Sequence, residues 1–174
     1  LRWCVPMEYG GKHESLDVRS LCLIRETLAR YDALADFSFA MQGLGSGAIS
    51  LYGNPEQKQN ILEKVSAGRM IAGFALSEPD AGSDAAAMNS KAFSTTDGWK
   101  VNGEKSWISN GGIADYYTLF AKTSDQPGSG GISAFLLEAD NPGLSVAERQ
   151  EVMAPHPLAR LQLKDAELNR EALL

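Results

Sequence analysis

The sequence predicts an α+β protein in which an N-terminal α-helical segment is followed by a small antiparallel β-barrel or sandwich. Up to about residue 67, apolar residues recur at the three- and four-residue spacing of amphipathic helices. From Ile71 onward they alternate with polar residues, as in half-buried strands. Glycine- and proline-rich turns separate these strand-like runs. We therefore expect an incomplete helical segment over residues 1–70 and a β-domain over residues 71–174.

Three helices are expected in the first part of the chain. Apolar stripes place the first over residues 17–31 and the second over residues 36–51, with Asp36 as the N-cap of the second. The third begins after Asn54, because Gln57 three residues later can complete a capping box. Short links between the three favour antiparallel packing.

The second part reads as a series of short strands. The dipeptides Asp97-Gly98 and Asn102-Gly103 each lie between strand-like runs, which is the strongest local signal for a tight hairpin turn. Several short strands at this spacing are typical of a small barrel or sandwich. The predicted strands cover residues 91–95, 99–101, 105–109, 116–122, 132–138, 144–149 and 158–164.

Composition narrows the range of functions. The net charge of −6 argues against nucleic acid as a partner, because phosphate backbones require a basic surface. No apolar run approaches the roughly 18 to 20 residues that a membrane span requires, and no targeting segment is seen at the start of this chain. Neither Cys4 and Cys22 nor His13 and His156 have metal-ligand spacing, so no metal site is predicted. Cysteine usage suits a reducing compartment, either bacterial cytoplasm or mitochondrial matrix.

Two stretches organise the β-domain. Residues 74–84 read as a strand that breaks into a turn of small polar residues, and residues 104–112 read as a strand ending in glycines. If hairpins join them in one sheet, Ser77, Ser83, Trp107 and Ser109 come together. Hydroxyls and loop amides can bind a polar ring or a phosphate, and an indole can lie against a flat apolar one. Taken singly, these residues have ordinary structural explanations, and a strand Trp is usually a core aromatic.

These stretches also carry a resemblance to a known family. Residues 74–84 read Phe-Ala-Leu-Ser-Glu-Pro-Asp-Ala-Gly-Ser-Asp, and residues 102–111 read Asn-Gly-Glu-Lys-Ser-Trp-Ile-Ser-Asn-Gly. The pair resembles the flavin-binding signatures of the acyl-CoA dehydrogenase family. Residues 5–11, 52–58 and 132–136 resemble further segments of that family, in the family's order. Two long motifs at compatible spacing are far more specific than one short motif.

The resemblance implies FAD-dependent α,β-dehydrogenation of acyl-CoA thioesters to 2-enoyl-CoA, with FAD as the cofactor. In this family a carboxylate takes the α-proton and the β-hydrogen leaves as hydride to the flavin, which supplies the electron sink that side chains lack. The resemblance places the catalytic Glu in a C-terminal helical bundle beyond Leu174, so that no catalytic residue is assigned here and the chain is expected to be inactive alone. It also implies electron-transfer flavoprotein as a partner and a homodimer or homotetramer at full length.

The resemblance assigns two sets of binding residues. Leu76 and Ser77 are expected at the pyrimidine end of the flavin, where donors stabilise the negative charge of the reduced ring. The full cofactor-binding set is Phe74, Ala75, Leu76, Ser77, Gly82, Ser83, Trp107, Ile108 and Ser109. The substrate-binding set is Ser83 for the pantetheine arm and Ala40 and Leu44 for the acyl chain. Glu78, in a tight turn, is expected to cap backbone amides rather than act as the base.

The chain also departs from the family pattern. Ser77 and Ser109 stand where the family usually has Thr, and residues 153–159 replace a Gly-x-Arg-x-Ser run, which leaves subfamily and substrate open. Three alternatives remain: a flavin oxidase or monooxygenase of the same fold, a non-catalytic module that binds FAD or CoA, and a structural β-domain whose signature is empty. Rapid oxidation of the reduced flavin by air would favour the oxidase or monooxygenase. Absence of bound flavin would favour the non-catalytic module. A flavin affinity that does not change when Trp107 and Ser109 are substituted would favour the structural β-domain.

Overall fold

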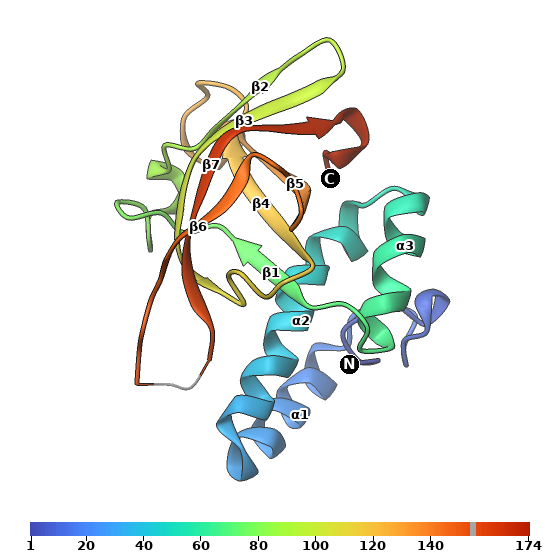
Figure 1. The fold of residues 1–174 in the computed structure, drawn as a ribbon. Coiled ribbons are helices and arrows are strands. Elements are labelled where there is room, and N and C mark those ends of the chain that lie inside the picture. Colours follow the sequence, from blue (N-terminus) through green and yellow to red (C-terminus); the bar gives the residue numbers. More distant parts are fainter. Residues whose placement is uncertain (154–155) are drawn as a thin grey trace. The chain divides into compact units, whose positions relative to one another are not determined.

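The computed structural model describes residues 1–153 and 156–174, so that part of the segment 153–159 noted above lies outside the described residues. The chain divides into two compact units, residues 1–72 and 73–174, which are described separately. Figure 1 shows helices in the first and a sheet in the second. In the part of the chain that is described, every helix falls short of the length and apolarity needed to cross a bilayer.

The helical unit contains α1 (Val18–Tyr31), α2 (Ala33–Tyr52) and α3 (Pro55–Ser66), preceded by a 3-10 turn, η1 (Met7–Tyr9). The capping box predicted for α3 is confirmed: the Gln57 amide donates to Asn54 Oδ1 at 2.9 Å, and the Asn54 amide donates to Gln57 Oε1 at 2.7 Å. These two bonds satisfy amides that the helix itself leaves unpaired. Sequence-local chemistry therefore fixes the start of α3.

The predicted start of α2 is wrong by one turn. Asp32, not Asp36, is the N-cap, and its carboxylate accepts hydrogen bonds from the amides of Leu34 and Ala35. The backbone of Asp32 is extended, as an N-cap requires. Asp36 lies in the first turn of α2, where both carboxylate oxygens accept hydrogen bonds from the Arg25 guanidinium of α1 at 2.9 Å. The carboxylate of Asp36, which the sequence predicted as the N-cap, is thus engaged in an ion pair with Arg25 instead.

In the second unit, the described residues form one curled sheet of seven strands, the half-barrel seen in Figure 1. The strand order is β1-β4-β2-β3-β7-β6, and β5 pairs with β4. The pairs β2–β3, β3–β7, β4–β5 and β6–β7 are antiparallel, but β2 and β4 are parallel, so the sheet is mixed rather than strictly antiparallel. The strands are β1 (Ala72–Ala75), β2 (Lys91–Ser94), β3 (Gly98–Ser109), β4 (Tyr116–Lys122), β5 (Ile132–Glu138), β6 (Leu144–Arg149) and β7 (Leu158–Asn169). Short 3-10 turns are η2 (Ala85–Ala87), η3 (Gly128–Gly131) and η4 (Arg170–Ala172).

One of the two predicted hairpin turns is present. Asp97-Gly98 joins β2 to β3, and the Thr95 amide donates to Gly98 O at 2.9 Å. Asn102-Gly103 is not a turn: β3 runs through it, with a register shift against β7 between Val101 and Gly103. A Cβ on Gly103 would lie 2.1 Å from Ser90 Oγ. The φ of Gly103 is 155°, a backbone conformation that residues with a side chain rarely adopt. Glycine at position 103 therefore allows β3 to pass close to Ser90 inside the sheet.

The sheet encloses an apolar core. Alternate residues of β4 and β5 point inward, so that Leu119 and Phe135 pair directly across the two strands with no exposed surface. Trp99 of β3 packs edge-on against Phe135, with ring centroids 5.3 Å apart. Each fully buried side chain of this kind stabilises the fold by about 1.5–3 kcal/mol. This core is the platform from which the loops after β1 and at the end of β3 project.

Candidate functional site

The segment after β1 forms a compact turn. Glu78 and Ala81 exchange backbone hydrogen bonds of 3.0 and 3.2 Å, and Ala81 is buried. Gly82 and Ser83 follow and are exposed. A Cβ at Gly82 would meet nothing within 4 Å, so packing inside the protein does not require glycine there. The open space beside the Gly82 backbone is available to an external group.

The Glu78 carboxylate is buried, with 5% of its surface exposed, and three donors occupy it. The amides of Asn89 and Ser90 donate to it at 2.6 and 3.0 Å, and Lys105 Nζ donates at 2.8 Å. Burial by itself would raise the pKa of this carboxyl, but the hydrogen bonds outweigh burial and hold the pKa below its usual range. Glu78 therefore caps backbone amides, as expected of a carboxylate in a tight turn, and is poorly suited to accept a proton from a substrate.

Lys105 is fully buried and ties the turn to β3. Its Nζ donates to Leu76 O at 3.0 Å as well as to Glu78. Burial lowers the pKa of this ammonium group, and the adjacent Glu78 carboxylate opposes that shift. Sequence reasoning missed this residue, because its partner Glu78 lies 27 positions away along the chain.

The two stretches singled out in the sequence do meet. The Ser106 amide donates to Ser77 O at 2.9 Å, so the turn after β1 lies against the last part of β3. The contact arises without the two successive hairpins proposed, because β1 and β3 are separated by β4 and β2 in the sheet. Ser77 and Ser109 are half-buried and Ser83 is exposed.

Trp107 is not a core aromatic. Its side chain is 58% exposed, and its backbone is left-handed, with φ of 59°. A bulky residue in this conformation is an outlier that persists only where neighbouring contacts determine it. Two such contacts come from Gln150, whose Oε1 accepts from the Trp107 amide at 2.8 Å and whose Nε2 donates to Ser106 Oγ at 3.2 Å. No sequence signal marked Gln150.

The other residues predicted to bind the cofactor have different surroundings. Ile108 and Ala75 are buried in the apolar core, so neither presents its side chain at the surface. Phe74 packs against Phe120 with ring centroids 5.0 Å apart. Beyond Ser109, the Gly112 amide donates to the Tyr117 hydroxyl at 2.9 Å. The chain therefore presents the Trp107 indole, the serine hydroxyls and backbone groups, rather than a continuous row of side chains.

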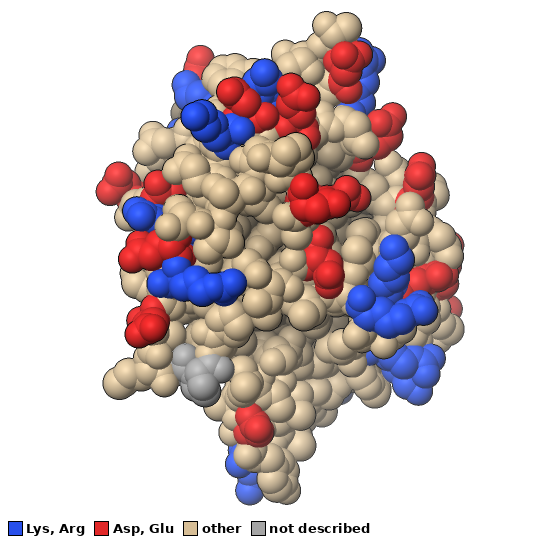
Figure 2. All heavy atoms as spheres, viewed as in Figure 1, with Lys and Arg blue, Asp and Glu red and all other residues tan. Residues whose placement is uncertain are grey.

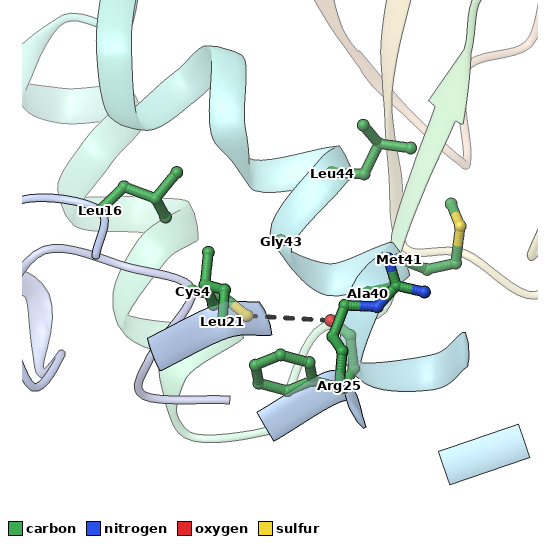
Figure 3. A pocket seen from close by; sticks show the side chains of 9 residues that line it. Cys4, Leu16, Leu21, Arg25, Ala40, Met41, Gly43 and Leu44 are labelled. Carbon is green, nitrogen blue, oxygen red and sulfur yellow. Dashed lines mark hydrogen bonds between the residues drawn. The ribbon is translucent and has the colours of Figure 1, made fainter. Parts of the chain in front are cut away.

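The predicted acyl-chain residues lie in the helical unit. Ala40 and Leu44, one turn apart on α2, both line a pocket of about 260 Å³ (Figure 3). The remaining lining residues are Cys4, Leu16, Leu21, Arg25, Phe39, Met41 and Gly43. The Cys4 thiol donates to Phe39 O at 3.8 Å, drawn as the dashed line, and burial raises the pKa of this thiol. The lining is mainly apolar, and the charge of Arg25 is neutralised by Asp36.

On the face drawn in Figure 2, Lys and Arg side chains are interspersed with Asp and Glu side chains. Across residues 1–153 and 156–174, no group of three or more His, Cys, Asp or Glu side chains is arranged to hold a metal ion.

Two family profiles match this chain. The profile described as acyl-CoA dehydrogenase, middle domain, matches residues 73–166, and the profile described as acyl-CoA dehydrogenase, N-terminal domain, matches residues 1–69. The N-terminal domain profile precedes the middle domain profile along the chain, and the family is the one that the motifs resemble.

Individual proteins agree with the profiles. A probable acyl-CoA dehydrogenase of Mycobacterium leprae, FadE25, is 40% identical over 147 residues, or 84% of this chain and 37% of that protein. Butyryl-CoA dehydrogenase from Megasphaera elsdenii has a TM-score of 0.89 at 34% identity, covering 97% of this chain and 45% of its own. PigA, solved with FAD and proline, has a TM-score of 0.90 at 30% identity, covering 99% and 46%. The chain thus spans less than half the length of each.

Proposed function

Because the chain belongs to the acyl-CoA dehydrogenase family, we propose that it carries the FAD-binding segments of an enzyme that oxidises acyl-CoA thioesters to 2-enoyl-CoA. The observation that carries the proposal is the left-handed backbone of Trp107, which keeps a large aromatic side chain exposed beside the Ser77 segment. Strained residues that neighbouring contacts hold in place are concentrated at binding sites.

The residues present suit FAD. An exposed indole can cover an apolar ring face, and the hydroxyls of Ser77 and Ser109 can bond its polar edge. The space beside Gly82 admits a pyrophosphate without a side-chain clash. When bound, the flavin supplies the electron sink for removal of the β-hydrogen.

Each segment of the chain has its own task in this proposal. The amide of Leu76 and the hydroxyl of Ser77 donate toward the pyrimidine end of the flavin, with Leu76 O already fixed by Lys105. Trp107 excludes water from one face of the flavin ring system, and Ser109 lies near the N5 atom of that ring system. Ser83, exposed beyond the turn, contacts the pantetheine arm, while Ala40 and Leu44 contact the acyl chain. Glu78 does not serve as the base, because its carboxylate already accepts hydrogen bonds from the Asn89 amide and Lys105 Nζ.

A second candidate rests on a specific relative. PigA, which shares this fold, was solved with FAD and proline, so the fold accommodates a bound molecule that is not an acyl thioester. The alternative function is a flavin oxidase or related enzyme of the same fold that acts on another class of substrate. Its reduced flavin would react rapidly with oxygen rather than pass electrons to electron-transfer flavoprotein.

The test uses the gene product purified as encoded. We expect bound FAD, bleaching of its visible absorption by an acyl-CoA, formation of the 2-enoyl-CoA, and reoxidation by electron-transfer flavoprotein faster than by air. Bound flavin that acyl-CoA thioesters of all chain lengths leave oxidised would refute the dehydrogenase and favour the second candidate. Absence of flavin after reconstitution with FAD would refute both and indicate a non-catalytic module.

A further inference from the structure

The strand β3 contains a β-bulge at Trp107. Lys105 pairs with Leu161 of β7 and Ile108 pairs with Ala159, so that Ser106 and Trp107 together lie opposite the single residue Arg160. A bulge of this kind interrupts the ladder of backbone hydrogen bonds and turns one side chain out of the regular alternation. Here the outward side chain is the exposed indole of Trp107.

Gln150 supplies the bonds that the ladder does not. Its carboxamide spans the bulge: Oε1 accepts from the Trp107 amide at 2.8 Å, and Nε2 donates to Ser106 Oγ at 3.2 Å. Gln150 is itself anchored, because its amide donates to Leu158 O at 2.9 Å directly after β6, whose last residue, Arg149, pairs with Ala159. The backbone that carries the carboxamide is therefore fixed beside the β6–β7 pairing.

We propose that Gln150 is a positioning residue for the flavin site: it holds Trp107 in the left-handed conformation and thereby keeps the indole directed at the cofactor. The proposal rests on the proposed function only for the identity of the cofactor. The bracing of the bulge is a property of the protein alone, so it can be measured without FAD. Loss of the carboxamide frees the Trp107 backbone to leave the left-handed conformation within the bulge, which moves the indole away.

Amide hydrogen exchange without FAD tests the brace. In Gln150→Leu, which keeps the bulk and removes both bonds, the Trp107 amide should exchange about fivefold faster, as expected for loss of a hydrogen bond of ordinary net strength. Gln162→Leu is the matched control, because Gln162 Nε2 donates to Gly103 O at 2.8 Å at the other irregularity of β3. Unchanged exchange at Trp107 in Gln150→Leu, or an equal change in Gln162→Leu, would overturn the proposal.

FAD affinity tests the consequence for the site. We expect the dissociation constant for FAD to rise at least about fivefold in Gln150→Leu and to recover in Gln150→Glu, whose carboxylate can accept from both Trp107 N and the Ser106 hydroxyl. In a Trp107→Ala background, Gln150→Leu should have no further effect. An equal loss of affinity in that background would mean that Gln150 does not act through Trp107, and would overturn the assignment.

The outcomes separate the two proposals. If the unsubstituted protein binds no FAD, the proposed function fails, while the exchange rate of the Trp107 amide still decides whether Gln150 braces the bulge. If Gln150→Leu does not fold, Gln150→Asn serves in its place, because a side chain shorter by one methylene cannot span both bonds. Exchange at Trp107 that remains as slow in Gln150→Asn as in the unsubstituted protein would refute the brace.

Discussion

The proposed flavin segment over residues 76–109 and the pocket between α1 and α2 differ in what holds their side chains in place. In the first, buried polar groups fix the backbone: Lys105 bonds Leu76 O and Glu78, and Gln150 bonds Trp107. In the second, the lining is mainly apolar, and its one guanidinium is 53% exposed. One site is preorganised by directional bonds, while the other is shaped by packing.

This difference has a physical consequence. Buried ion pairs add little net stability compared with apolar residues, but removal of one partner leaves an uncompensated charge and is strongly destabilising. Polar bonds therefore make the flavin segment intolerant of single substitutions. An apolar pocket has no such requirement and should tolerate changes in side-chain size at its exposed edge.

Lys105→Met should have the largest effect. It leaves the Glu78 carboxylate buried without its cation, which typically lowers the free energy of unfolding by about 3–5 kcal/mol. Urea unfolding followed by circular dichroism measures this change. Lys100→Met is the matched control on the same strand. Lys100 Nζ lies 3.7 Å from Glu167 Oε1, and the two side chains are 40% and 80% exposed. Such an exposed pair contributes less than about 1 kcal/mol to the free energy of unfolding. Equal losses in the two variants would show that the buried pair is no more important than the exposed one.

The pH dependence of stability should report on the buried pair of Glu78 and Lys105. Because the pKa of Glu78 is lowered in the folded protein, its carboxylate stabilises the fold above the unfolded value of about 4.3, and this contribution is lost as the pH falls through the lower folded value. The advantage of the unsubstituted protein over Glu78→Gln should therefore be constant from about pH 7 to 5 and shrink below that. Urea unfolding at several pH values measures it. A flat profile for Glu78→Gln would contradict the prediction.

Sequence patterns were sufficient where local chemistry decides the structure. The capping box of Asn54 and Gln57 and the Asp97-Gly98 hairpin were both predictable, because each depends on residues within a few positions of one another. The choice between Asp32 and Asp36 as N-cap was not, since either carboxylate suits the role and a contact with Arg25, 11 residues away, decides it. Asn102-Gly103 misled for a related reason: pairing with β7 overrides a strong local turn signal.

The candidate site divides in the same way. The two stretches were recognisable as motifs, and the structure brings Ser77 O and Ser106 N together, but their strands are not the sheet neighbours that were expected. The residues that hold those stretches were not predictable, because Lys105 bonds Glu78 across 27 positions and Gln150 bonds Trp107 across 43. Nothing in a single sequence marks an ordinary Lys or Gln as the partner of a distant turn. Motif stretches are therefore easier to find from sequence than the distant residues that bond to them.

Asn54→Ala should have a smaller and more local effect. Loss of an N-cap side chain typically lowers stability by about 1 kcal/mol, and here the loss should appear as faster amide exchange in the first turn of α3. Gln59→Ala, at an exposed position of the same helix, should change exchange little, because alanine is the stronger helix former. If Asn54→Ala also accelerated exchange at Trp107, the two units would not respond separately, and the contrast drawn above would fail.

Leu44→Trp should have the smallest effect on stability and a selective effect on substrate choice. Leu44 is 49% exposed at the edge of the α1–α2 pocket, so a larger side chain can be accommodated with a change within about 0.5 kcal/mol. If the pocket receives the acyl chain, the indole removes space for distal methylenes, each worth about 1–3 kcal/mol of discrimination. The ratio of kcat/KM for short over long acyl-CoA thioesters should then rise about tenfold or more. Leu51→Trp, 69% exposed on the same helix and outside the pocket lining, controls for added aromatic surface. An unchanged ratio in Leu44→Trp would remove Ala40 and Leu44 from the acyl site and leave substrate selection to residues outside this pocket.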